Sequence, residues 1–548
     1  MEKANSANSF VRQAAILAVA GISARLLGFL YRLPLTHLIG DEGNAVYAVG
    51  FYVYSIFLII SSAGLPAAIS KLVSEKRAIG RHDLAHKIFV IAFILSASVG
   101  AVFMAVIFIF AQVITEALGT PMAYLALQTL APTVFIVAMM AVIRGYFQGM
   151  SSTVPTAISQ VTEQVFNAIF SIILAHAMWN FALRQGHETI VYGAAGGTAG
   201  TGVGALAGLI IIAGLYFIAR PDIIKEVRLG KNKARRFEAY TAESNSQIVR
   251  NIATTSFIIV AGTAIFSVAS LIDVWLVTDR LSAAGLGEVR ARELFGQLTG
   301  KFNPLTNLPA AISSSLAIAV IPAIAAAKAV GNHRDVAAKI NTALRAAMLL
   351  TVPIAFGLGA LGPQIVALLF PSHPEGGTLF VVGFPSVIFL AISQIATGVL
   401  QAIGKISIPV FAALAGAAVK IVVSFFLIAN PAVNIYGAII GTILMYLVTA
   451  GINCIFLSRH TGTRLDFVGI LAKPTMASLA MALACYTFYH LAYWLLDSNA
   501  AATLLAIFVG MGVYAVFMVL IKGFADEDIR LLPRGQRLLN YMKRKGFV

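Results

Sequence analysis

Long uninterrupted apolar segments restrict the fold of this chain more than any other feature of its sequence. A helix needs about 20 mostly apolar residues to cross the roughly 30 Å hydrocarbon core of a bilayer. Membrane-spanning β-strands are about ten residues long and alternate in polarity, so continuous apolar runs predict helices. The segments that meet the helical requirement are 13–33, 45–70, 88–112, 122–145, 157–178, 193–219, 250–278, 293–322, 341–370, 379–403, 409–430, 436–458, 471–495 and 500–523.

The composition agrees with an all-α integral membrane protein of about 14 transmembrane helices. Hydrophobic residues make up 59% of the 548 residues and charged residues 11%, against about 45–50% and about 25% in soluble domains. The two cysteines, Cys454 and Cys485, both lie in apolar segments, and no Cys/His cluster has metal-ligand spacing. The sequence therefore predicts no disulfide framework, no metal site and no cofactor.

The basic residues are distributed unequally between the two sides of the predicted membrane. Those on the side opposite the N-terminus are Arg184, Arg280, Arg290 and Arg292. Those inside predicted spans are Arg25, Arg32, Lys301 and Lys420. The other 31 of the 39 lie on the N-terminal side, which predicts cytosolic termini in a bacterial-type plasma membrane. These basic residues are spread over many loops, which is typical of contacts with lipid headgroups and argues against a single nucleic-acid-binding groove.

Motifs of the first half of the chain recur in the second half in the same order. Three pairs carry the repeat: Gly64–Ser70 with Val320–Ala326, Gly145–Pro155 with Gly398–Pro409, and Tyr192–Thr198 with Tyr436–Thr442. Each copy contains six spans, an even number, so both halves insert with the same orientation. We therefore predict two parallel six-helix lobes, related by a pseudo-twofold axis along the membrane normal, around a central cavity.

The repeat also predicts the domain organisation, with two extra helices after the second lobe. The predicted parts are an N-lobe at 1–219, a cytosolic basic linker at 220–249, a C-lobe at 250–458, the two extra helices at 459–523 and a cytosolic basic tail at 524–548.

Five motifs together resemble one known family. They are Arg25–Arg32, Gly40–Gly43, Gly64–Lys71, Arg144–Met150 and Pro155–Glu163. In these motifs, and over essentially the whole chain, the sequence resembles the polysaccharide-transporter branch of the MOP flippase superfamily, which includes SpoVB, YtgP and MurJ-type proteins. The resemblance implies a V-shaped pair of lobes and a groove for the lipid tail at the last two helices. MurJ-type members also have an arginine on the second span, and the span at 45–70 lacks one.

The resemblance implies transport, with no catalytic residue. The implied substrate is an undecaprenyl-pyrophosphate-linked sugar unit, with lipid II, the peptidoglycan precursor, first among the candidates. Transport by alternating access would carry it from the cytosolic to the external leaflet, and cell-wall synthesis machinery is an implied partner. Another lipid-linked glycan, of capsule, teichuronic or spore-cortex type, and a MATE-like antiporter remain alternatives. A glycosyltransferase, polymerase or ligase would need an extramembrane domain with paired carboxylates, and a non-transporting scaffold leaves the intramembrane cations unexplained.

Cations inside the spans are the predicted substrate-binding residues. A pyrophosphate cannot cross hydrocarbon without partners, and intramembrane charges are costly and usually functional. Arg25 and Arg32 are seven residues apart and lie on nearly one helix face, where guanidinium forks match phosphate oxygens. Lys301 precedes Asn303-Pro304, which we expect to break its helix, and Arg144 ends the fourth span. Alternatives are headgroup snorkelling for Arg32 and a topology anchor for Arg144.

The acidic residues inside spans predict ion pairs or coupling sites. Glu163 on the fifth span is the expected partner of Arg25 if that arginine is structural. Asp273 on the seventh span and Lys420 on the eleventh form either a static pair or a site that couples transport to Na+, H+ or the membrane potential.

The first external loop contains two further acidic residues, Asp41 and Glu42. The sequence leaves two interpretations open for them. They form either a solvated turn or an external gate that pairs with Arg32.

Overall fold

The structure is helical throughout the residues that it describes. It is a computed structural model, and the described residues are 16, 19–236, 244–310, 313, 324, 327–328, 332–405 and 407–524. Eleven helices within these ranges are long and apolar enough to cross a membrane, and a shorter apolar helix covers Val19–Leu30. No strand occurs in the same ranges. The total of about 14 spans remains a prediction, because the predicted spans 13–33 and 293–322 lie partly outside the described residues, as does nearly all of the predicted tail.

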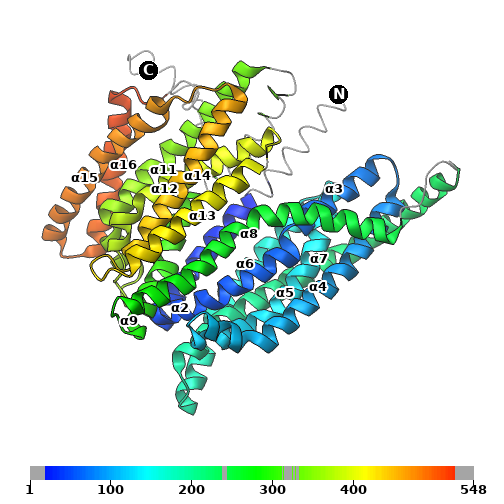
Figure 1. Cartoon of the computed structure of the whole chain (residues 1–548), viewed down its shortest axis with the longest axis horizontal. Coiled ribbons are helices and arrows are strands. Elements are labelled where there is room, and N and C mark those ends of the chain that lie inside the picture. The colour runs from blue at the N-terminus through cyan, green and yellow to red at the C-terminus, as the bar shows by residue number, and fades with distance from the viewer. Residues whose placement is uncertain are drawn as a thin grey trace. The chain divides into compact units, whose positions relative to one another are not determined.

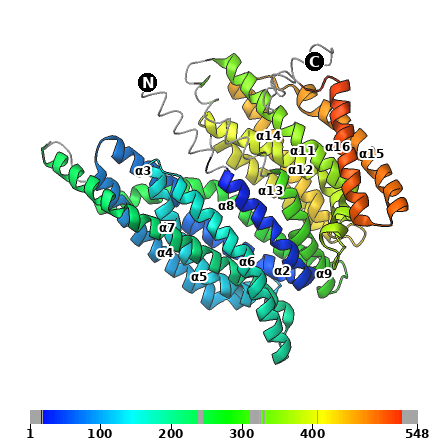
Figure 2. The same cartoon turned by 180° about the vertical axis from the view of Figure 1, so that it is seen from behind.

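The chain divides into two compact units, Met1–Thr278 and Asp279–Val548. Long helices run alongside one another within each unit (Figures 1 and 2). Elements of the first unit are α2 (Arg32–Leu58), the π-helical turn η1 (Ile59–Ala63), α3 (Leu65–Ala78), α4 (His82–Ala117), the 3-10 turn η2 (Pro121–Ala123), α5 (Tyr124–Gly149), α6 (Val154–Gln185), α7 (Thr189–Arg236) and most of α8 (Asn245–Ala283).

Elements of the second unit include the two extra C-terminal helices. They are α9 (Glu288–Gln297), the π-helical turn η3 (Leu298–Phe302), α11 (His333–Leu369), α12 (Thr378–Ala402), α13 (Ser407–Ile428), α14 (Tyr436–Thr461), the π-helical turn η4 (Val468–Ala472), α15 (Lys473–Leu496) and α16 (Asn499–Leu520). The side chains of α15 and α16 pack against each other and against α11.

Helices that correspond in the sequence repeat make the same pairings in both units. In the first unit α4 packs on α5, and α5 and α6 each pack on α7. In the second unit α11 packs on α12, and α12 and α13 each pack on α14. These four helices of each unit thus have equivalent neighbours, as the repeat predicts, whereas the motif copy at 320–326 lies almost wholly outside the described residues.

The predicted linker at 220–249 is largely helical. α7 continues through Pro221 to Arg236, and α8 begins at Asn245. α8, the helix predicted to open the second lobe, packs closely against Gly64 of the first unit. The evidence is that a Cβ added to Gly64 would lie 2.6 Å from the carbonyl oxygen of Ser256 on α8. The boundary between the two compact units along the chain lies after Thr278, and the predicted lobe boundaries stay a prediction.

The predicted first external loop is a reversal at a single residue, Gly40, whose φ of 69° and ψ of −175° interrupt α2. On either side of it, Asn44 Nδ2 donates a hydrogen bond to Thr36 Oγ1 at 3.0 Å, and the hydroxyls of Tyr31 and Tyr47 lie 3.0 Å apart. Tyr31 and Tyr47 are 16 residues apart in the sequence and would be separated by about 24 Å in a straight helix. The chain therefore folds back at Gly40, where a positive φ favours glycine.

Of the two interpretations left open for Asp41 and Glu42, burial disfavours the solvated turn, and the external gate stays a prediction. Asp41 is buried, with 7% of its surface exposed, and Glu42 is half-buried. Both lie in the first turn after the reversal, where a carboxylate interacts favourably with the helix dipole. A Cβ at Gly43 would lie 2.6 Å from the Cβ of Ile39, so the second glycine of the motif is needed for the close approach of the two helical segments.

A row of glycines brings α7 close to α6. Gly196, Gly200, Gly204 and Gly208 recur every four residues and therefore share one face of α7. A Cβ at Gly204 would lie 2.5 Å from the carbonyl oxygen of Glu163, and one at Gly200 would overlap Ser171. Small residues allow this backbone approach inside a membrane, where packing and hydrogen bonds provide most of the association energy.

The orientation predicted from the basic residues can be tested by cysteine labelling. With Cys454 and Cys485 replaced, a single cysteine at the exposed Glu116 should react with an impermeant maleimide added to intact cells. A cysteine at the exposed Lys225 should react only after permeabilisation, because the positive-inside pattern places the end of α7 in the cytosol. The reverse pattern would overturn the orientation.

Candidate functional site

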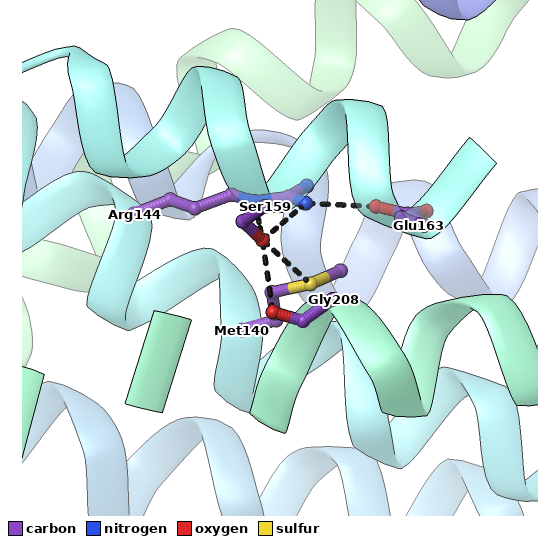
Figure 3. A network of polar contacts seen from close by, with 5 residues as sticks. All are labelled: Met140, Arg144, Ser159, Glu163 and Gly208. Carbon is purple, nitrogen blue, oxygen red and sulfur yellow. Dashed lines mark hydrogen bonds and ion pairs between the residues drawn. The ribbon is translucent and has the colours of Figure 1, made fainter. Parts of the chain in front are cut away.

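Arg144 and Glu163 form an ion pair inside the apolar helices of the first unit. Arg144 lies in the last part of α5 and Glu163 in the first half of α6. The Nη2 of Arg144 lies 2.8 Å from the Oε2 of Glu163, and the two side chains retain 16% and 18% of their surface exposed. Figure 3 shows the guanidinium between the carboxylate and a third side chain, Ser159.

Ser159 holds the guanidinium at this position. Its Oγ accepts hydrogen bonds from the Nη2 of Arg144 at 2.8 Å and from the Nε at 3.3 Å. The same hydroxyl, fully buried, lies 3.0 Å from the carbonyl oxygen of Gly208, to which it donates, and 3.6 Å from the sulfur of Met140. A Cβ at Gly208 would lie 3.1 Å from that sulfur, so the glycine row of α7 brings the carbonyl within reach of Ser159.

Glu163 pairs with Arg144. The sequence suggested Glu163 as the partner of Arg25 if that arginine is structural, and the ion pair that the structure places at Glu163 is a different one. Arg25 lies on the exposed side of the helix Val19–Leu30, which packs near α6, since a Cβ at Gly28 would lie 3.6 Å from the Oε1 of Gln164. A role for Arg25 in substrate binding stays a prediction.

Arg32 packs against aromatic rings close to the reversal at Gly40. Its guanidinium carbon lies 5.1 Å from the centre of the Tyr47 ring, within the range of a cation–π interaction. Tyr47 is 1% exposed, and its hydroxyl is hydrogen-bonded to that of Tyr31. The folded-back helix therefore holds Arg32 against a rigid aromatic surface. Its pairing with an external gate stays a prediction.

Lys301 is fully buried in the second unit. Its Nζ donates to the carbonyl oxygens of His373, at 2.7 Å, and Glu375, at 3.0 Å, and lies 5.7 Å from the centre of the Phe370 ring. These contacts tie Lys301 to the segment between α11 and α12. A role for Lys301 in substrate binding stays a prediction.

The helix break predicted at Asn303-Pro304 is wrong. The π-helical turn η3 ends at Phe302, and helix continues from Asn303 to Ala310. A proline lacks the amide that an α-helix would use there, and the wider π-turn absorbs the altered hydrogen bonding.

The other predicted pair is divided between the two units. Asp273 lies half-buried on α8 in the first unit, and Lys420 lies on α13 in the second with 7% of its surface exposed. A static pair or a coupling site formed by these residues stays a prediction. Among the described residues, no group of three or more His, Cys, Asp or Glu side chains could hold a metal ion.

Sequence reasoning missed two residues of this region. Ser159 lies one turn before Glu163, in the same motif that carried the family resemblance, and that spacing was the available signal. Tyr47 carried no such signal, because its contact with Arg32 depends on the reversal at Gly40.

Apolar helices of membrane-crossing length with ion-paired side chains inside them define a multi-pass membrane protein. The chain belongs to the polysaccharide biosynthesis protein family of the MOP superfamily, since the model of that family matches residues 10–328. A second model, MatE, matches residues 298–426.

Curated relatives cover most of the chain. Stage V sporulation protein B of Bacillus subtilis (strain 168) is 26% identical over 539 residues, which are 97% of this chain and 99% of that protein. The lipid II flippase MurJ of the same organism is 23% identical over 502 residues, 89% of each chain.

Solved structures show the same fold. The inward closed conformation of a lipid II flippase MurJ matches with a TM-score of 0.63 at 16% identity, over 92% of this chain and 98% of that one. The inward-facing conformation of a multidrug resistance MATE family transporter of the MOP superfamily also matches with a TM-score of 0.63, at 15% identity, over 81% of this chain and 98% of that one.

Proposed function

We propose that this protein is a flippase that moves a lipid-linked sugar precursor between the leaflets of a bacterial plasma membrane. The observation that carries the proposal is the arginine held by Ser159 inside the apolar helices of a chain from this family. The precursor's phosphate groups need fixed positive partners in a medium of low dielectric constant. Arg144 offers a planar fork of donors that fits phosphate oxygens, and Arg25 and Arg32 are further candidates on the neighbouring helical segments.

Lipid II is the first candidate substrate, delivered from the cytosolic to the external leaflet by alternating access. This choice rests on the similarity to proteins named lipid II flippase MurJ. The protein performs no chemistry in this proposal, and its driving force is a Na+ or H+ gradient or the membrane potential. Membrane lipids surround it, and cell-wall synthesis enzymes are candidate partners on the receiving side.

A different lipid-linked glycan is the second candidate. The similarity to stage V sporulation protein B favours a precursor used in sporulation, and capsule or teichuronic units have the same pyrophosphate chemistry. A MATE-like antiporter is the third candidate, favoured by the fold match and by the intramembrane carboxylate of Glu163.

Depletion of the protein in its own organism tests the proposal and identifies the substrate. We expect one undecaprenyl-linked precursor to accumulate in the cytosolic leaflet. An impermeant reagent added outside the cells modifies the precursor in the external leaflet. The unmodified precursor is then extracted and quantified by mass spectrometry. Purified protein in vesicles should then move that same lipid between leaflets. Unchanged precursor levels together with no lipid movement in vesicles would reject the flippase assignment.

A further inference from the structure

The ion pair between Arg144 and Glu163 is incomplete. The Nη2 group donates one hydrogen bond to Glu163 and one to Ser159, and the Nε donates to Ser159 as well. Within the described part of the chain, the Nη1 of Arg144 and the Oε1 of Glu163 make no hydrogen bond, and neither atom is fully enclosed. The two side chains retain 16% and 18% of their surface exposed, so the pair keeps a donor and an acceptor that are not used within it.

Arg144 keeps its position without help from Glu163. Ser159 accepts two of its hydrogen bonds, and the hydroxyl is itself fixed by donating to the carbonyl oxygen of Gly208 on α7. Glu163 contributes a single contact, at 2.8 Å. Loss of that contact would therefore leave an aligned guanidinium able to bind another anion in the same place.

We propose that the Glu163 carboxylate and the substrate phosphate compete for the same position on Arg144, and that Glu163 is protonated when the phosphate displaces it. In the protein without substrate, the carboxylate occupies this position. A phosphate oxygen of the substrate replaces it, and the released carboxylate takes up one proton from water to become a neutral carboxyl group. This deepens the proposed function, on which it rests, because it states how anion binding is coupled to protons.

Electrostatics favours this proton uptake. Two anions beside one cation in a medium of low dielectric constant repel each other, and protonation of the carboxylate removes that repulsion. The charged group in contact with Glu163 is Arg144 from α5, and α7 approaches Glu163 with Gly204 and Gly208. The helix Val19–Leu30, which carries Arg25, approaches the neighbouring Gln164. Protonation of Glu163 is therefore the change that keeps the site close to neutral when a phosphate binds.

Calorimetry of the full-length protein in detergent tests the exchange. Lipid II is titrated in two buffers of different ionisation enthalpy, and the difference in heat gives the number of protons taken up. We expect uptake of up to one proton per lipid bound, with affinity that weakens by as much as ~10-fold per pH unit as pH rises. Both quantities should vanish in Glu163→Gln, whose neutral amide should bind with the affinity that the wild type reaches at low pH.

Two further variants separate the exchange from damage to the fold. Glu163→Asp keeps a titratable group and should keep the proton uptake. Glu116→Gln makes the same change at an exposed carboxylate near the end of α4 and should behave like the wild type. Proton uptake by Glu163→Gln equal to that of the wild type would overturn the proposal.

A soluble probe distinguishes failure of the exchange from failure of the flippase assignment. UDP-N-acetylglucosamine has a diphosphate diester without a proton that titrates near neutral pH. Lipid II binding without linked protons would reject the exchange and leave the flippase assignment standing. Binding of the soluble probe with proton uptake that depends on Glu163, in the absence of lipid II binding, would support the exchange and count against lipid II. Binding of neither compound would overturn the exchange.

Discussion

Arg144→Ala is expected to reduce the initial rate of lipid II movement in vesicles by more than ~100-fold. The substitution removes a guanidinium that can make two charge-assisted hydrogen bonds, each contributing about 1.5–3 kcal/mol, and a loss of about 3 kcal/mol corresponds to roughly 100-fold. Arg144→Lys should retain about a tenth of the rate, because a lysine provides a point charge without the planar fork. Movement is measured from the accessibility of labelled lipid at limiting substrate concentration.

Controls for this prediction lie in the same unit. Arg184→Ala removes an exposed arginine from the end of α6 and should leave the rate unchanged. The double substitution Arg144→Ala with Glu163→Gln leaves no unpaired charge, so it should be more stable than Arg144→Ala alone but remain inactive. Recovery of transport by the double variant would mean that Arg144 serves to neutralise Glu163 and has no role in binding.

Lys301→Ala is expected to lower the stability of the second unit by roughly 3 kcal/mol or more. The change deprives two carbonyl oxygens, of His373 and Glu375, of a charged donor, and hydrogen bonds to charged groups contribute about 1.5–3 kcal/mol each. The lost volume also leaves a cavity, because the side chain is fully buried. Thermal unfolding of the purified protein should begin at least about 6 °C lower.

The matched control is Lys339→Ala. Lys339 pairs with Asp335 on α11 at 2.6 Å, with both side chains more than a third exposed, and such surface pairs contribute under about 1 kcal/mol. Its melting temperature should be close to that of the wild type. Unchanged stability of Lys301→Ala combined with lost transport would contradict this structural role and support the predicted substrate contact of Lys301.

The helical membrane class and the internal repeat were predictable because they depend on patterns along the chain. Apolar length indicates a membrane helix whatever its neighbours, since a backbone in hydrocarbon must satisfy its own hydrogen bonds. The repeat predicted equivalent neighbours, and α5 and α12 do occupy equivalent positions between their partner helices. Glu163 was recognised as unusual because intramembrane charges are rare, and Arg144 was a candidate because it ends the fourth span.

Contacts between residues distant in the sequence were less accessible to such reasoning. The sequence suggested Arg25 as the partner of Glu163. Side-chain pairing, however, depends on how helices are rotated about their axes. In this structure the glycine face of α7 packs against α6, and this packing brings Ser159 and Glu163 to Arg144. Lys301 was interpreted as a substrate contact because a buried charge is costly. Carbonyl oxygens from the segment between α11 and α12 compensate that cost, and no sequence pattern marks backbone atoms as partners.

The sequence by itself determined that the chain is an all-helical membrane protein with two related halves, because hydrophobicity and repetition act locally and accumulate over long segments. The tertiary structure alone decided which charges meet. It reversed the chain at Gly40 and so placed Arg32 over Tyr47. It also brought Arg144 between Ser159 and Glu163, because an ion pair needs atoms within about 4 Å, and only the packing of α5, α6 and α7 sets distances of that size.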